Sequence, residues 1–193
     1  MGIYLVSVAA QDWSHLGEDG YGDVAAALDT ELERRGLPPY EPQEAVREAP
    51  PGWFEEKVSP SMDGFLALCT THLTDTELST LLDWSVLVPL ALEEEIVLPV
   101  GTAYSGDETT VAGAARVLAL AERLAAAIGL PLDAIPAGEN LALSLWFLEG
   151  EAERAAQVWP GPWAEDLDAA FYVAFYLRAA QYCLRYGCPM TYS

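Results

Sequence analysis

Apolar residues along this 193-residue chain follow two different spacings, one typical of strands and one typical of helices. Residues 3–9 (IYLVSVA) form an apolar run rich in β-branched and aromatic side chains, which predicts a buried strand. In residues 21–36 the apolar positions Val24, Leu28 and Leu32 instead recur at every fourth residue. That spacing predicts an amphipathic helix with one face toward the core.

Capping signals divide the middle of the chain into further helices. Residues 74–77 (TDTE) have the spacing of a capping box, which predicts a short helix after an earlier one at 60–73. Residues 105–108 (SGDE) repeat that spacing and predict a long helix that ends at Gly129. Another helix is expected over residues 139–158.

The last predicted helix follows a Gly-Pro pair and carries apolar or aromatic side chains on nearly all of its faces. A helix without a wide polar face is typical of the centre of a protein. We therefore expect this C-terminal helix to be central and buried, with its tyrosines in the core rather than around a cofactor. The side chains concerned are Phe171, Tyr172, Val173, Phe175, Tyr176, Leu177, Tyr182 and Tyr186.

Three adjacent glutamates interrupt an apolar run in the middle of the chain. In one continuous strand the central one would lie in an apolar row, where an unpaired carboxylate costs about 2–5 kcal/mol. A turn at residues 92–95 removes that problem, so the sequence predicts a hairpin near residues 85–104. The turn would point all three carboxylates into water: Glu93, Glu94 and Glu95.

Together these elements predict an α+β fold, in which a small mixed sheet of about three strands is covered by about six helices. The chain has the length of one domain and contains no long linker, so we expect a single globular domain over residues 1–193.

Charge is the strongest signal for function. Thirty acidic residues face nine basic ones, which gives a net charge of −21. Residues 1–33 and 58–115 contain no lysine or arginine at all. Such a field repels nucleic acid and anionic membranes and attracts basic proteins. We therefore expect a basic protein partner and neither nucleic acid nor membrane binding. The alternative is that the acidic residues serve only to keep the protein soluble.

The sequence carries none of the short motifs of common catalytic or metal chemistry. Its two histidines and three cysteines lack H-E-x-x-H or C-x-x-C spacing, so we expect no metal and no cofactor. No apolar run approaches the ~18 residues of a membrane span, and the N-terminus lacks the features of a signal peptide. These observations predict a cytoplasmic protein, and they leave its oligomeric state open.

Two loops combine aromatic side chains with carboxylates, a mixture that is common at protein interfaces. In each loop, packing of the aromatic side chain into the core is the alternative. With the glutamate turn, these loops supply the candidate partner-binding residues: Trp13, Glu18, Asp19, Trp53, Glu55, Glu56, Glu93, Glu94 and Glu95.

Three functional hypotheses follow. The first is an acidic cytoplasmic binding protein that engages a basic protein partner, such as an immunity protein that inhibits a cationic toxin. The second is a small hydrolase-like enzyme with a site near Asp12, His15 and Tyr104, which the lack of catalytic motifs disfavours. The third is a regulatory or structural subunit that associates through its apolar helices.

Overall fold

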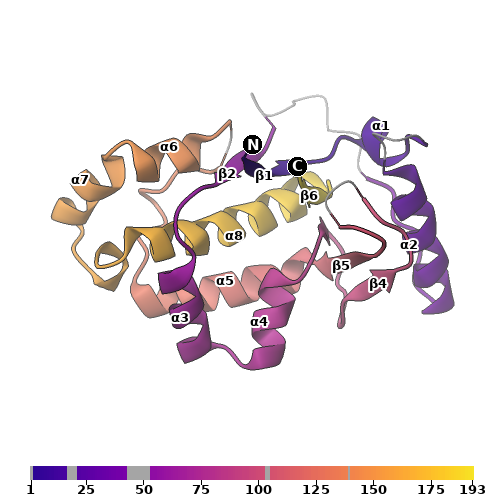
Figure 1. Cartoon of the computed structure of the whole chain (residues 1–193), viewed down its shortest axis with the longest axis horizontal. Helices are drawn as coiled ribbons and strands as arrows, with labels where there is room; N and C mark the ends of the chain where they lie inside the picture. Colours follow the sequence, from indigo (N-terminus) through magenta and orange to yellow (C-terminus); the bar gives the residue numbers. More distant parts are fainter. Residues whose placement is uncertain (1, 17–20, 43–52, 103–104, 139) are drawn as a thin grey trace.

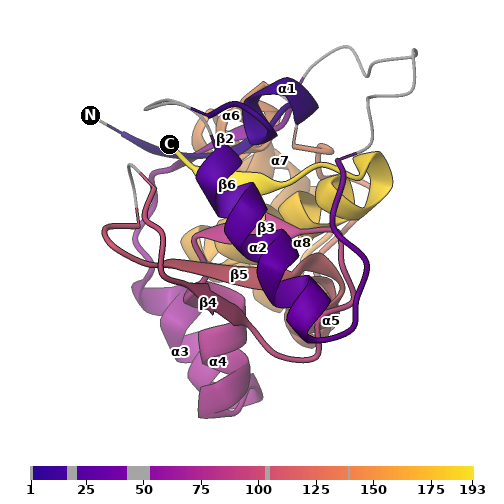
Figure 2. The ribbon, with the colours of Figure 1, turned by 90° about the vertical axis from the view of Figure 1, so that its right-hand side faces the viewer.

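The computed structural model shows a mixed sheet with helices on both of its faces. Figure 1 shows α8 (Leu167–Tyr186) running through the middle of the molecule beside α5 (Ala114–Ile128). Figure 2 shows α2 (Gly22–Arg34) lying across the opposite face of the sheet. The structure describes residues 2–16, 21–42, 53–102, 105–138 and 140–193.

The sheet of the described residues has six strands in the order β2-β1-β6-β3-β5-β4. β3 and β5 are parallel, and the other neighbouring strands are antiparallel. The strand bounds are Ile3–Ser7 (β1), Glu55–Val58 (β2), Val86–Val88 (β3), Ile96–Leu98 (β4), Thr109–Gly113 (β5) and Met190–Tyr192 (β6).

The predicted mixture of helices and a mixed sheet is confirmed, but the predicted number of strands is wrong. β2, β5 and β6 were not anticipated. β2 contains Glu55 and Glu56, which the sequence placed in a loop. β5 follows the capping signal at residues 105–108, where a helix was expected. β6 is three residues long, and it is a strand because it pairs with β1 and β3. The prediction of about six helices is also too low, because the described residues contain eight α-helices.

The predicted hairpin near residues 85–104 is wrong, because β3 and β4 do not pair with each other. β5 lies between them, so that Val111 is opposite Val86 on one side and Ile96 on the other. The connection from β3 to β4 passes over the end of β5 at Gly113. A Cβ at that position would lie 2.6 Å from the Leu90 carbonyl oxygen. The absence of a side chain at Gly113 therefore lets the connection cross.

The two faces of the sheet bury different side chains of the same strands, because side chains alternate along a strand. Leu87 and Ala112 belong to the core around α8. Val86, Val88 and Val111 pack in a second apolar cluster beneath α2. β3 is therefore buried on both faces, as is typical of a central strand covered by helices.

α8 is the centre of the larger core, as its sequence predicted. Its buried residues include aromatic side chains on several faces, and it contacts α5, α3 (Asp63–His72) and α6 (Ala142–Leu148). The Asp166 carboxylate caps the helix by accepting a hydrogen bond from the Ala169 backbone N–H at 2.9 Å. No helix of the described residues is long and apolar enough to cross a membrane.

The remaining helices confirm part of the predicted boundaries. α4 (Asp75–Leu82) opens with the expected capping box, and α5 ends before Gly129, which is in the left-handed conformation. The helix expected over residues 139–158 is two helices, α6 and α7 (Glu151–Val158). They are separated at Gly150, whose φ of +88° is incompatible with a continuous helix. A short α1 (Ala10–Trp13) and a 3-10 turn η1 (Pro162–Ala164) complete the described helical elements.

Candidate functional site

Trp13, which the sequence placed among the candidate partner-binding residues, is part of the core in this structure. Its side chain is 1 % exposed, stacks on Tyr21 and meets the edge of Tyr40. Its indole N–H has no hydrogen-bond partner among the described residues. The apolar cluster beneath α2 therefore takes up this tryptophan, as the core alternative anticipated.

Glu56 is buried, whereas its neighbour Glu55 is partly exposed. Glu56 is 0 % exposed, and its carboxylate accepts hydrogen bonds from the Leu143 N–H, the Ser144 N–H and the Ser144 hydroxyl at 2.7–2.8 Å. Burial raises the pKa of Glu56, while the hydrogen bonds from Ser144 and Leu143 oppose that shift. Glu56, which the sequence also placed among the candidate partner-binding residues, is therefore buried and joins β2 to α6.

Trp53 lies at the surface and contacts Glu55. Its side chain is 64 % exposed, and its indole N–H donates to the Glu55 carboxylate at 3.2 Å. The backbone of the same segment is tied to the start of α6, because the Leu141 N–H donates to the Glu55 carbonyl oxygen at 2.8 Å. Trp53 and Glu55 thus remain candidates for partner contact.

Glu93 and Glu94 lie in an exposed bend between β3 and β4, as predicted, although the hairpin is absent. The predicted exposure of Glu95 is not met in full, because this residue is partly buried and its Oε1 atom is inaccessible to water. An arginine distant in sequence meets this bend: the Arg116 guanidinium donates to the Glu93 carbonyl oxygen and lies 4.0 Å from the Glu95 carboxylate. Burial raises the pKa of Glu95. Three features together outweigh that effect and lower the pKa. They are the nearby Thr80 hydroxyl, which does not complete an ordinary hydrogen bond, the Glu95 backbone and the Arg116 charge.

Two groups of acidic candidates remain, Glu55 and the glutamate bend, and they lie at opposite edges of the sheet. Glu55 is on the edge strand β2, and the glutamate bend precedes β4 at the other edge. Six strands place these edges about 24 Å apart, because neighbouring strands are about 4.8 Å from each other. The structure therefore does not bring the two clusters into one compact patch.

The residues of the enzyme hypothesis do not assemble into a pocket that the structure describes. Asp12 and His15 are exposed at α1 and just after it, and neither lines the pocket described below. Tyr104 lies outside the described residues, as do the candidates Glu18 and Asp19. Among the described residues, no group of three or more His, Cys, Asp or Glu side chains could hold a metal ion.

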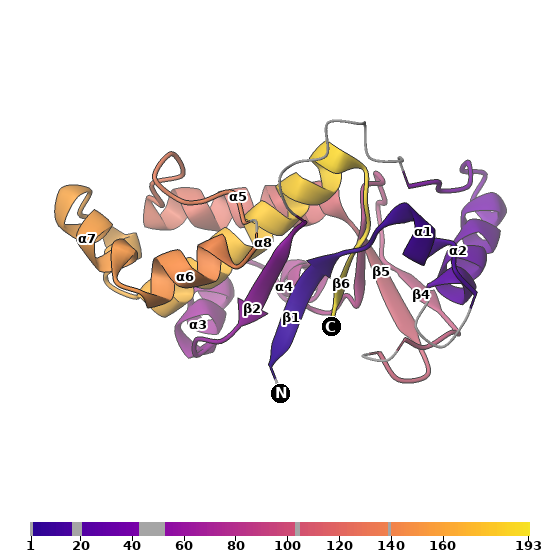
Figure 3. The same cartoon turned by 90° about the horizontal axis from the view of Figure 1, so that it is seen from above.

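α6 and α7 carry an exposed surface that sequence reasoning missed. Figure 3 shows these helices at the end of the molecule opposite α2. Both helices expose carboxylates as well as apolar side chains, and we call these exposed residues together the α6–α7 surface. It consists of Leu145 (46 % exposed), Leu148 (53 %), Val158 (65 %) and Trp159 (52 %), with Glu149, Glu151 and Glu153.

Tryptophan contacts hold the α6–α7 surface against the body of the protein. Trp163 is 1 % exposed, stacks on Trp146 of α6 and donates its indole N–H to the Trp159 carbonyl oxygen at 2.9 Å. Ala152 and Ala155 face inward from α7 and are buried. The outward side chains therefore stand on a packed support. In the sequence, this surface could have been predicted from the apolar residues that lie outside the inward face of each helix.

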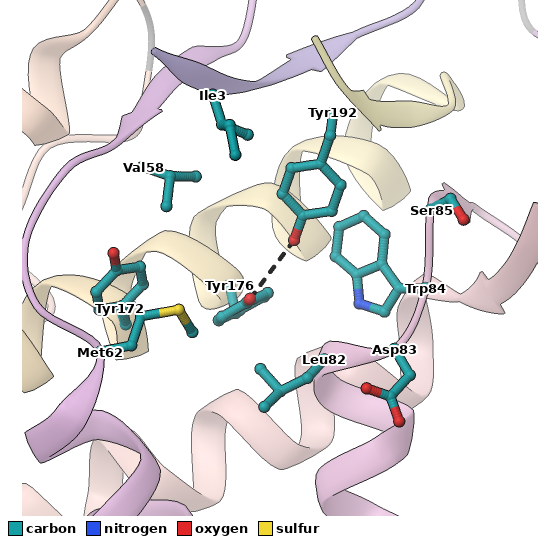
Figure 4. Close-up of a pocket in the computed structure, with 10 residues that line it drawn as sticks. All are labelled: Ile3, Val58, Met62, Leu82, Asp83, Trp84, Ser85, Tyr172, Tyr176 and Tyr192. Atoms are coloured by element: carbon teal, nitrogen blue, oxygen red, sulfur yellow. Dashed lines mark hydrogen bonds between the residues drawn. The ribbon is translucent and has the colours of Figure 1, made fainter. Parts of the chain in front are cut away.

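An aromatic pocket of about 460 Å³ lies where the ends of β1, β2 and β6 meet α8 and the connection from α4 to β3. Figure 4 shows its lining, in which three tyrosines, one tryptophan and aliphatic side chains surround a small number of polar atoms. The Tyr176 and Tyr192 hydroxyls point toward each other at 3.4 Å. Tyr172 and Tyr176 are thus both core residues, as predicted, and part of a pocket wall, which was not predicted.

No family model matches the chain, and neither curated proteins nor solved structures match it. The candidate site therefore depends on its own geometry.

Proposed function

We propose that this protein is an acidic binding protein that engages a basic protein partner, in the manner of an immunity protein that inhibits a cationic toxin. The observation that carries the proposal is the α6–α7 surface, where two short helices on a packed support expose both apolar side chains and carboxylates. Apolar and aromatic anchors supply most of the binding energy at such interfaces, and complementary charge raises the association rate.

The described arginines support this proposal, because most of them are already engaged within the chain. Salt bridges join Arg34 and Arg35 to Glu31, and Arg123 to Glu77. The first arginine pair lowers the pKa of Glu31 to about 2, and Arg123 lowers that of Glu77 to about 2. These cations are thus held by a few carboxylates of the chain, and most of the 30 acidic residues stay available to an external partner.

The same pattern holds for the arginines nearer the proposed surface. Arg154 of α7 pairs with Glu151 one turn away. Arg178 donates to the carbonyl oxygens of Leu132, Ile135 and Pro136 rather than to a carboxylate. Glu149 and Glu153 form no salt bridge among the described residues, so they are the carboxylates of this surface that a partner's lysine or arginine would meet.

The proposal is tested by affinity capture from a lysate of the source organism, with two charge-matched variants. Glu149→Gln with Glu153→Gln changes the α6–α7 surface, whereas Glu33→Gln with Glu122→Gln changes α2 and α5. Each pair takes the net charge from −21 to −19 (−21 + 2). A basic protein retained at low salt is then purified and titrated calorimetrically against all three forms.

We expect the purified partner to bind the wild type and the α2/α5 variant equally. It should bind the α6–α7 variant about five- to tenfold more weakly, because the two lost charge contacts contribute about 0.5–0.7 kcal/mol each. Equal losses for both variants would show that only the total charge matters. The absence of any retained basic protein at low salt would remove the proposal. Sedimentation of the isolated protein checks that the surface does not serve self-association.

A further inference from the structure

The aromatic pocket has the chemistry of a small-molecule site that is separate from the α6–α7 surface. Its volume of about 460 Å³ falls in the range of about 300–1,000 Å³ that is usual for such sites. Most of its lining is apolar or aromatic, including Ile3, Val58, Met62 and Leu82. The lining contains no lysine, arginine or histidine, and its single charged residue is Asp83. An anionic ligand would therefore lose its hydration without gaining a cation.

Hydrogen bonds and ring contacts hold the walls of the pocket in place. The Tyr172 hydroxyl donates to the Pro60 carbonyl oxygen at 2.7 Å, and the Trp84 indole N–H donates to the Leu81 carbonyl oxygen at 2.9 Å. Trp84 also stacks on Tyr192, with 5.2 Å between ring centroids. A cavity whose walls are fixed in this way binds a ligand without the cost of ordering its side chains.

Two phenol groups face each other within the pocket, apart from the polar groups of Asp83, Ser85 and Tyr172 in its lining. The Tyr176 and Tyr192 hydroxyls are 3.4 Å apart, which is longer than the usual 2.7–2.8 Å of an O–H···O bond. Their mutual hydrogen bond is therefore weak, and one hydroxyl keeps its proton free for another acceptor. Burial raises the pKa of Tyr176, and it raises that of Tyr192 to about 12, so both groups stay uncharged at neutral pH. Buried tyrosine hydroxyls normally find a partner.

We propose that the aromatic pocket binds a compact, uncharged, apolar ring compound that carries one hydroxyl group. The ring lies between the aliphatic and aromatic walls, and the hydroxyl sits against Tyr176 and Tyr192, where it both donates and accepts. Ile3 is 53 % exposed and stands at the pocket, so it marks a point where a larger side chain would block entry.

Isothermal titration calorimetry of the full chain tests the proposal with three probes that share one ring system. 2-Naphthol is uncharged at neutral pH and carries the hydroxyl, 2-methylnaphthalene lacks it, and 2-naphthoate carries a negative charge. We expect 2-naphthol to bind most tightly and 2-naphthoate at least about tenfold more weakly, because desolvation of an unpaired carboxylate opposes binding.

Filling variants locate the binding site. Ile3→Trp should weaken 2-naphthol binding at least tenfold. Val97→Trp, at a strand residue of similar exposure (59 %) on β4, should leave it within twofold. Val58→Phe provides a second filling variant from β2, and thermal unfolding of each variant confirms that it folds. Equal binding by wild type and filling variants, tight binding of 2-naphthoate, or no binding of 2-naphthol would each overturn the proposal.

The phenol pair has its own test. Tyr176→Phe removes one hydroxyl and keeps the ring, so it should weaken 2-naphthol binding by about three- to tenfold. It should leave the affinity for 2-methylnaphthalene unchanged, because that probe makes no hydrogen bond. A merely structural role of Tyr176 would instead weaken both probes alike, which would contradict the assignment. The outcome is independent of whether the α6–α7 surface binds a basic protein.

Discussion

Glu56 shows how one side chain can connect two elements that are distant in the sequence. Its carboxylate accepts three hydrogen bonds from the first turn of α6, and it does so without an arginine or lysine. β2 is the edge strand of the sheet, and the same turn of α6 also occupies the outer side of that strand, since the Lys57 N–H donates to the Ser144 hydroxyl. Glu56 therefore holds in place the helix that protects this edge from pairing with another chain.

Substitution Glu56→Gln is expected to lower the free energy of unfolding by about 1–3 kcal/mol. The amide nitrogen would face a backbone N–H, so one buried donor would lose its acceptor. The measurement is urea denaturation at neutral pH, with Glu55→Gln as the matched control. That neighbour is partly exposed, so its substitution should change stability by less than about 0.5 kcal/mol. Equal effects at the two positions would contradict the role assigned to Glu56.

At the scale of the elements, the path of the chain around β5 decides the topology. β3 pairs parallel with β5, and β4 then pairs antiparallel with the other side of the same strand. The connection between them has to cross the end of β5, and it crosses at Gly113, beside the backbone of Leu90 and Leu92. The apolar and acidic pattern around residues 92–95 is equally compatible with a hairpin turn and with this crossing. Only the strand that enters between β3 and β4 distinguishes them.

Substitution Gly113→Ala is expected to destabilise the protein by about 1–3 kcal/mol, because the new methyl group would collide with the backbone. Gly113 has a φ of −84°, which alanine adopts readily, so the effect would be steric. The matched control is Gly36→Ala, where φ is +73° and nothing lies within 4 Å of the added atom. That control carries only backbone strain, of about 1 kcal/mol. Thermal unfolding compares the two, and a smaller loss at Gly113 would argue against the close crossing.

The whole molecule carries far more negative than positive charge, and its structure neutralises little of it. The salt bridges of the described residues involve Glu31, Glu77, Glu95 and Glu151. The remaining carboxylates repel one another across the surface, and such self-repulsion opposes the compact state. Surface ion pairs contribute only about 0–1 kcal/mol each to stability. Salt should therefore stabilise the protein more by screening the repulsion than it destabilises it by screening these pairs.

The thermal unfolding midpoint should therefore rise when NaCl increases from about 10 mM to about 500 mM, since the screening length falls from about 30 Å to below about 5 Å. Scanning calorimetry measures the shift. A variant that combines the four Glu→Gln changes at residues 33, 122, 149 and 153 should show a smaller rise, because it has less repulsion to screen. A midpoint that falls with salt would mean that the arginine pairs dominate the electrostatics.

The sequence by itself determined the features that depend on neighbouring residues. It predicted the α+β class, the buried C-terminal helix, the capping box of α4 and the end of α5 at Gly129, because propensity, capping and periodicity are local. The tertiary structure alone decided what depends on distant partners. It made strands of three short segments by pairing them, buried Glu56 while leaving Glu55 partly exposed, and brought Arg116 to the glutamate bend. It also assembled the aromatic pocket from side chains of α8, β6 and the α4–β3 connection, which no sequence pattern places together.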